Sequence, residues 1–339
     1  MDPRLSELKC WSALMLAQLG ETLSENWQCS VVAGDASFRR YFRLTGADSS
    51  WICVDAPPEK EDNPKFIAIA RSWSEQGVNV PAVLGEDIAQ GFMLLQDFGD
   101  KLLWPALHDD ADHERVLALY KLAIDELINI QKLKAGELPA YDAALLRQEI
   151  SLFTDWLCER QISLSLSADE HRLIADVTDI LVDSALAQPQ VVVHRDYHSR
   201  NLMLCADGVL GVIDFQDAVQ GAVTYDLVSL LRDCYVRWPH QIVDELTSYC
   251  HEKASLAGVL DMPYDAFFRA FDLMGMQRHL KAAGIFARLN IRDGKAGYLA
   301  DIPNTCVYLR EVAGRYYEFS AFCQWLDDRF LPAMEKGLS

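Results

Sequence analysis

The sequence predicts an α+β fold in which a small β-rich lobe precedes a larger, mainly helical lobe. Residues 30–34, 39–44 and 51–55 are rich in β-branched and aromatic residues and are separated by turn signals, which is typical of strands. After Gly99, apolar residues recur at spacings of three and four, which is typical of amphipathic helices. We therefore expect one lobe over residues 1–98 and a second over residues 99–339.

The remaining elements of the first lobe follow from the same patterns. The first twenty residues indicate an amphipathic helix, residues 63–77 indicate a second helix that ends at Gly77, and strands are expected near 82–87 and 91–96. In the second lobe we expect helices over 111–134, 142–162, 167–187, 225–236, 240–257 and 264–290, with strands over 191–193, 202–205 and 209–213.

Composition excludes several classes of function. The net charge of −19 argues against a nucleic-acid partner. No apolar run reaches the roughly 18 residues of a membrane-spanning helix, and the N-terminus lacks the pattern of a signal peptide. The nine cysteines form no CxxC pair and no zinc-ligand spacing, which favours reduced thiols. We expect a cytoplasmic monomer that does not bind membranes.

Residues 191–219 contain the most informative motif. A buried strand leads to Asp196, Asn201 follows five residues later, and Asp214 comes thirteen residues after that. If Asp207-Gly208 forms a two-residue turn, residue 206 pairs with 209 and Asn201 lies directly opposite Asp214. Opposed side chains have Cβ atoms about 4.5–5.5 Å apart, and their oxygens are ligands that Mg²⁺ prefers.

These residue types match the chemistry of phosphoryl transfer. Mg²⁺ held by Asn201 and Asp214 would neutralise the phosphate oxygens of ATP. A carboxylate at Asp196 would orient an acceptor hydroxyl and accept its proton. The motif therefore predicts an ATP- and Mg²⁺-dependent kinase.

The same residues carry a resemblance to known enzymes. His194-Arg195-Asp196 with Asn201 is similar to the catalytic loop of protein kinases, and Ile213-Asp214-Phe215 stands where those enzymes have their metal-binding motif. His198 and the Gln216-Asp217 pair resemble the aminoglycoside phosphotransferase and choline kinase superfamily instead. The resemblance covers essentially the whole chain and implies a protein-kinase-like bilobal fold. It also implies that Asp226 supports the catalytic loop that contains His194.

The resemblance further implies where the nucleotide binds. Gly34 and Ser37 lie in the loop that would cover the phosphates, and the backbone of Gln96 and Phe98 would meet the adenine. Kinase-like enzymes usually carry a lysine on the third strand, and this strand, WICVDAPP, has none. Either Arg40 or Arg43 replaces it, or the loop and the metal hold the phosphates alone. Asp97-Phe98-Gly99 is interpreted as a structural turn, because it precedes the catalytic loop by about a hundred residues.

Longer segments are similar to one branch of that superfamily, the bacterial anomeric amino-sugar kinases of cell-wall recycling. The segments are HRDYHSRNLM, TYDLVSLLRDCYVRWP and KAAGIFARLNIRDGKAGYLADIP. The branch phosphorylates N-acetylmuramate and N-acetylglucosamine at the C1 hydroxyl, so ATP and an amino sugar are the implied partners. We expect Tyr235 and Trp238 to offer an aromatic surface to the sugar, and Asp217 and Arg232 to bind its polar groups, the arginine suiting a carboxylate.

Two alternatives stay open at this point. The acceptor could be another hydroxyl compound, such as an aminoglycoside, choline or homoserine. The absent lysine also allows a nucleotide-binding pseudokinase, although such a protein needs no base at Asp196. Residues 284–303 concentrate cations, including Arg288 and Arg292, and either line the substrate mouth or form a solvated loop.

Overall fold

The computed structural model describes residues 2–21, 27–32, 38–46, 49–107, 112–206, 208–234 and 236–338. The chain divides into two compact units, each built from two segments. Unit 1 comprises Met1–Ala111 with Ser199–Gln216, and unit 2 comprises Asp112–His198 with Asp217–Ser339. The predicted lobes divide the chain differently, because they assign residues 99–111 and 199–216 to the helical part.

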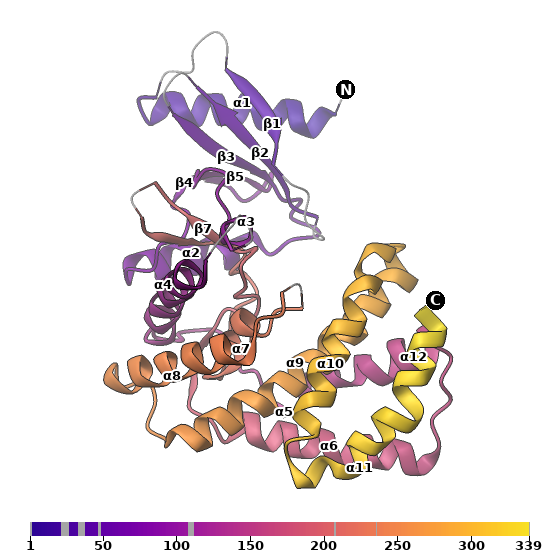
Figure 1. Ribbon diagram of the computed structural model, residues 1–339. Helices are drawn as coiled ribbons and strands as arrows, with labels where there is room; N and C mark the ends of the chain where they lie inside the picture. The colour runs from indigo at the N-terminus through magenta and orange to yellow at the C-terminus, as the bar shows by residue number, and fades with distance from the viewer. Residues whose placement is uncertain are drawn as a thin grey trace. The chain divides into compact units, whose positions relative to one another are not determined.

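Unit 1 is organised around an antiparallel sheet that has five strands in the described residues. The strands are β1 (Gln28–Val31), β2 (Arg40–Thr45), β3 (Ser50–Asp55), β4 (Val83–Asp87) and β5 (Phe92–Gln96), in the order β1-β2-β3-β5-β4. Helix α1 (Pro3–Gln18) covers one face of this sheet (Figure 1). Its Leu8 and Leu16 pack in one core with Phe42, Leu44 and other apolar side chains of the strands.

The two longer helices of unit 1 begin at sequence signals for a helix start. In α1, the side chain of Asp2 caps the helix and Pro3 occupies its first turn. In α2 (Asn63–Glu75), Asp62 and Pro64 have the same roles. The amphipathic first helix and the helix predicted over 63–77 are thus confirmed.

A short hairpin, β7 (Leu202–Leu204) with β8 (Leu210–Val212), belongs to unit 1 although it lies far along the chain. Its backbone is tied to the first segment, since Leu204 donates to the carbonyl of Lys101 and Val212 donates to that of Asn79. The short helix α3 (Leu103–Ala106) adds a further bond, from the Trp104 N–H to the Ser199 carbonyl. These bonds explain why the hairpin groups with the sheet and not with the helices that flank it in sequence.

Unit 2 is mainly helical. Its elements are α4 (His113–Gln131), α5 (Ala143–Leu152) continuing into the π-helical η1 (Phe153–Gln161), α6 (Ala168–Leu186), β6 (Gln190–Val193), β9 (Val219–Ala222), α7 (Tyr225–Leu231), α8 (His240–Leu256), α9 (Tyr264–Asp293), η2 (Ala296–Asp301), α10 (Ile302–Ala313), η3 (Tyr317–Phe319), α11 (Ser320–Trp325), η4 (Leu326–Phe330) and α12 (Leu331–Leu338). Strands β6 and β9 pair antiparallel beneath the loop that follows Val193.

Helix α9 is the central helix of this unit. Residues 270–280 of α9 are buried without interruption, and they include polar side chains such as Gln277, Arg278 and His279. Gly284 allows a close crossing with α5, because a Cβ there would lie 2.5 Å from the Leu152 carbonyl oxygen. A helix that long and that buried brings charged residues into the interior, where they need partners.

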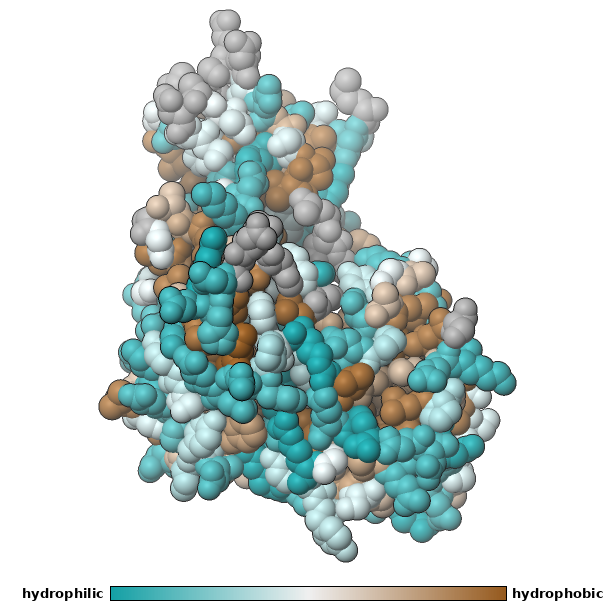
Figure 2. Space-filling view, viewed as in Figure 1, coloured by the Kyte–Doolittle hydropathy of each residue, from teal (hydrophilic) through white to brown (hydrophobic). Residues whose placement is uncertain are grey.

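The fold class predicted from the sequence is confirmed, and most predicted elements are present. Strand β9 and the helices after residue 301 were not predicted, and the helix expected over 225–236 ends at Leu231. No helix in the described ranges is both long and apolar enough to cross a membrane. The face drawn in Figure 2 is mostly hydrophilic, with apolar side chains in small, separate areas.

Candidate active site

The loop after β6 is held by a buried carboxylate. Asp226, in the first turn of α7, accepts the backbone N–H of His194 at 2.7 Å and that of Arg195 at 3.0 Å. Arg195 has φ +77°, a conformation that costs a non-glycine residue free energy and persists only where its surroundings enforce it. Asp226 supplies that enforcement, and this is the contact that a supporting role for Asp226 requires.

The burial of Asp226 has an electrostatic cost. The side chain is fully buried, and burial raises its pKa to about 7, although the two backbone N–H groups and Arg278 act in the opposite direction. His194 is also fully buried, and its Nδ1 accepts the backbone N–H of Asp196 at 3.3 Å. Both residues therefore shape the loop from within and do not face solvent.

Asp196 itself is accessible. Its side chain is 46% exposed, and its Oδ1 lies 3.9 Å from Nη2 of Arg278. Burial would raise the pKa of Asp196, but Lys281, His198 and Arg278 outweigh burial and lower it below its ordinary value. The group is therefore a carboxylate at neutral pH, as an acceptor of a hydroxyl proton must be.

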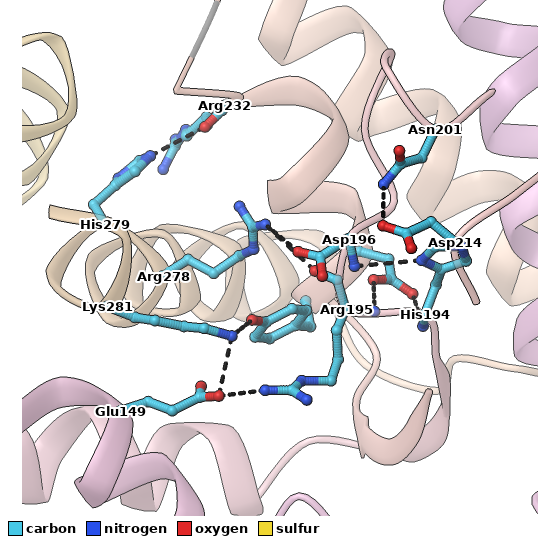
Figure 3. A network of polar contacts seen from close by, with 12 residues as sticks. Glu149, His194, Arg195, Asp196, Asn201, Asp214, Arg232, Arg278, His279 and Lys281 are labelled. Atoms are coloured by element: carbon cyan, nitrogen blue, oxygen red, sulfur yellow. Dashed lines mark hydrogen bonds and ion pairs between the residues drawn. The ribbon is translucent and has the colours of Figure 1, made fainter. Parts of the chain in front are cut away.

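A buried ionic cluster lies next to Asp196 within unit 2, and the sequence did not reveal it. Glu149 on α5 binds Arg195 and the Tyr141 hydroxyl, and it lies 3.1 Å from Nζ of Lys281 on α9. Arg195 and Lys281 both point toward Glu149 (Figure 3). Lys281 also donates to the Tyr225 hydroxyl at 3.0 Å. A buried ion pair is costly unless further hydrogen bonds satisfy it, and this cluster has them.

The hairpin in unit 1 brings Asn201 and Asp214 together by a register that differs from the predicted one. Leu202 pairs with Val212, and Cys205 donates to the Val209 carbonyl, so the turn has three residues and not two. The predicted register is therefore wrong by one residue. Asn201 Nδ2 still donates to Asp214 Oδ2 at 3.2 Å, because Asp214 takes a left-handed conformation with φ +66°.

The side chains around Asp214 fit a hard cation. Gln216 Nε2 donates to Asp214 Oδ1 at 2.7 Å, and Gln216 Oε1 is buried without a hydrogen-bond partner. Carboxylate and amide oxygens are the ligand types that Mg²⁺ takes in proteins. In the described part of the chain, no group of three or more histidine, cysteine, aspartate or glutamate side chains could hold a metal ion. A magnesium site here would thus use one carboxylate and neighbouring amides.

A comparison with protein families decides the class of protein. The model of the Phosphotransferase enzyme family matches residues 28–259, which is more than half of the chain. The chain belongs to this family.

Curated relatives of this phosphotransferase share one name. The chain is 42% identical over 327 residues to an N-acetylmuramate/N-acetylglucosamine kinase of Pseudomonas aeruginosa, and the match covers 94% of this chain and 95% of that protein. It is 43% identical over 299 residues to the kinase of the same name of Neisseria meningitidis serogroup B, covering 87% of this chain and 88% of the relative.

Solved structures support the fold. A choline kinase from Streptococcus pneumoniae superimposes with a TM-score of 0.60 at 12% identity, covering 90% of this chain and 99% of that one. An ADP-bound aminoglycoside phosphotransferase gives a TM-score of 0.58 at 13% identity, covering 88% and 98% of the two chains. At these identities the likeness concerns the fold alone.

The two arginines expected to bind phosphate lie on opposite faces of the sheet of this phosphotransferase. Arg40 shares the face of Phe42, which α1 covers, and it binds Asp55 and Asp2. This placement counts against a phosphate role for Arg40, because α1 and the two carboxylates occupy its surroundings. Asp55, near the expected lysine position, is fully buried and pairs also with Arg4 at 2.5 Å.

Arg43 lies on the other face, and acidic residues engage it too. It binds Asp97 at 2.6 Å, Asp100, and the carbonyl of Gly99 at 2.8 Å. Asp97 accepts the N–H of Gly99 at 2.9 Å, and Gly99 has φ +85°, which is compatible with the structural role expected for the Asp97–Gly99 segment. Arg43 therefore fixes this segment, and a phosphate would have to compete with two carboxylates for it.

Sequence reasoning missed a third arginine, Arg39, which directly precedes β2. Arg39 is buried, lies 3.2 Å from Glu61, and stacks over the Phe66 ring of α2 at 5.2 Å. The only signal in the sequence is the Arg39-Arg40 pair at the start of the strand predicted over 39–44.

The remaining predicted nucleotide contacts are partly outside the described residues. Gly34 and Ser37 lie outside the described residues. The backbone N–H of Gln96 donates to the Ala82 carbonyl at 2.9 Å and is already used. The Phe98 ring packs against Gly211 of the hairpin, where a Cβ would lie 2.6 Å from it.

The predicted substrate residues have diverse environments. Arg232 is buried, binds the buried Asp272, and stacks over Phe271. These contacts count against a substrate role for Arg232, which stays a prediction. Trp238 is half-buried and donates to the Tyr120 hydroxyl at 2.7 Å. Asp217 is exposed, and Tyr235 lies outside the described residues.

Proposed function

We propose that this phosphotransferase transfers the γ-phosphoryl group of ATP to the anomeric C1 hydroxyl of N-acetylmuramate and N-acetylglucosamine, in the recycling of the cell wall. The observation that carries the proposal is the 42% identity, over 94% of this chain, to a protein named for that activity. The presence of Asp196, Asn201 and Asp214 supports a working enzyme and not a pseudokinase, because nucleotide binding alone needs no base.

Asp196 acts as the base in this proposal. Its ionised and accessible carboxylate accepts the proton of the sugar hydroxyl as the new O–P bond forms. The bond between the γ-phosphorus and the β–γ bridging oxygen breaks, and ADP leaves. Asp226 and His194 hold the backbone N–H groups of residues 194–196, which lead up to and include the base, so that its carboxylate keeps one orientation.

Asn201 and Asp214 would hold Mg²⁺, with Gln216 beside them. When bound, the ion neutralises charge on the β- and γ-phosphate oxygens. The contacts of Gly34, Ser37, Gln96 and Phe98 with the nucleotide remain predictions, as do the cytoplasmic location and the monomeric state. For the phosphate cation, Arg43 is better placed than Arg40, because α1 does not cover its face of the sheet, although Asp97 and Asp100 already engage it.

The first experiment is a coupled ADP-release assay with Mg-ATP. The acceptors are N-acetylmuramate, N-acetylglucosamine, kanamycin, choline and homoserine, and phosphorus NMR identifies the product. We expect a C1-phosphate from the two amino sugars. Turnover with only one of the other three acceptors would replace the sugar assignment by another kinase activity.

Asp196→Asn tests the role of the base. We expect kcat to fall by about 10²–10⁴-fold while Mg-ATP still binds, because general-base catalysis typically contributes that much. Asp183→Asn is the matched control, since it makes the same change at an exposed position on α6. Near-normal turnover in Asp196→Asn would refute the assignment.

A further inference from the structure

One face of α9 carries a row of cations that starts beside Asp196. Arg278, Lys281, Arg288 and Arg292 are spaced by three, seven and four residues, which places them on the same side of a helix. In a chain of net charge −19 this row is unusual. The sequence predicted a concentration of cations over residues 284–303. Those that precede Gly294, Arg288 and Arg292, belong to α9, which ends at Asp293.

Three of these cations have an anionic neighbour. Arg278 lies near Asp196, Lys281 pairs with Glu149, and Arg292 pairs with Asp293 at 2.8 Å. Each of these positive charges is therefore at least partly balanced within the protein.

Arg288 differs from the rest of the row. No carboxylate of the described residues lies within ion-pair distance of it, and its half-buried side chain has a buried Nε–H without an acceptor. Burial and the neighbouring Arg292 lower the pKa of Arg288 and outweigh the opposite effect of Asp293 and Glu149, so the surroundings of Arg288 disfavour its charge. A guanidinium in such surroundings gains more from a carboxylate than a solvated one does.

Arg288 lies on the same helix, α9, as Arg278, which lies near the base Asp196. Arg288 lies seven residues after Lys281, which is about 10 Å along the helix axis. Side chains on a helix lean toward its N-terminus, so Arg288 leans back toward Lys281 and Arg278. Arg278 is itself nine-tenths buried, and its Nε–H also lacks an acceptor. The helix face thus offers unsatisfied donors in the direction that leads to Asp196.

We propose that Arg288 binds the carboxylate of an acidic acceptor whose hydroxyl is presented to Asp196. The inference rests on the proposed function, in which N-acetylmuramate carries a carboxylate and N-acetylglucosamine does not. Arg288 then takes the role expected from the sequence for Arg232, whose charge Asp272 already satisfies in the core. A planar guanidinium can bind a carboxylate through two parallel hydrogen bonds.

The test compares both sugars in one variant. In Arg288→Met, the ratio of kcat/KM for N-acetylmuramate to kcat/KM for N-acetylglucosamine should fall by about 10–100-fold, as expected for the loss of hydrogen bonds to a charged group. Arg288→Lys should recover part of that ratio, because it restores the charge without the planar fork. The matched control is Arg269→Met, on the same helix, where the arginine pairs with Glu318 at 2.5 Å. Its ratio should stay that of the unmodified enzyme.

Each other outcome has a definite meaning. An equal loss with both sugars would overturn the inference, because a residue that only supports the fold or the base does not distinguish them. An unchanged ratio in Arg288→Met would overturn it as well. If the unmodified enzyme phosphorylates neither sugar, the proposed function fails before the variants are compared.

Discussion

The fully buried Asp226 offers a sharp test of how the loop is held. Asp226→Asn keeps the shape of the side chain but leaves one oxygen for two backbone N–H groups, those of His194 and Arg195. The second N–H would then face an amide NH₂. A buried donor without an acceptor costs about 1–3 kcal/mol. We therefore expect Asp226→Asn to lower the free energy of unfolding by about that amount at pH values at which Asp226 of the unmodified protein is ionised.

The pH dependence makes the prediction specific. The pKa of Asp226 is about 7 in the folded protein, raised by burial, and near the ordinary aspartate value of 3.8 when the chain is unfolded. Between these values the folded state binds more protons, so the free energy of unfolding falls as pH rises. For this one group the decrease is about 2 kcal/mol between pH 5 and pH 7. Asparagine does not titrate. The difference in free energy of unfolding between the unmodified protein and Asp226→Asn should therefore shrink by that amount from pH 5 to pH 7.

The assay is urea unfolding of both proteins at pH 5, 6 and 7, followed by tryptophan fluorescence. Groups that do not interact with Asp226 contribute equally to both proteins and cancel in the difference. The neighbouring Asp196 has a pKa below its ordinary value and therefore stays ionised from pH 5 to pH 7. Asp183→Asn, at an exposed position, is the control and should show a constant difference. A constant difference for Asp226→Asn would refute the reasoning, because the carboxylate would then titrate alike in folded and unfolded chains.

Two further predictions concern the metal site and the base. Asp214→Ala should weaken Mg-ATP binding by at least tenfold in titration calorimetry, because it removes the carboxylate beside Asn201, and an unchanged affinity would contradict the metal assignment. In Lys281→Met, the acid limb of kcat/KM should move to higher pH, because burial raises the pKa of Asp196 and Lys281 is the largest influence that lowers it. A profile from pH 4 to 8 measures this shift, and an unmoved limb would show that Lys281 does not act on Asp196.

Local patterns were sufficient for most of the secondary structure. Strand alternation and turn signals predicted β2, β3 and β5, and apolar spacing predicted α4, α6 and α8, because these elements each bury one regular face. The same reasoning missed β9, whose segment Val219–Ala222 is short and contains a glycine. The hairpin register was missed because turn length depends on hydrogen bonds of Cys205 and Gly208 that no residue preference fixes.

The sequence by itself determined the fold class and the motif that contains Asp196, Asn201 and Asp214, because those residues lie within nineteen positions of one another in a strand–turn–strand context. Only the tertiary structure placed Glu149 and Lys281 near the base, since they come from α5 and α9, far apart in the chain. It likewise assigned Arg40 to the face covered by α1, and Arg232 to Asp272. A side chain's charge can be read from the sequence, but whether that charge is already neutralised depends on which distant element packs beside it.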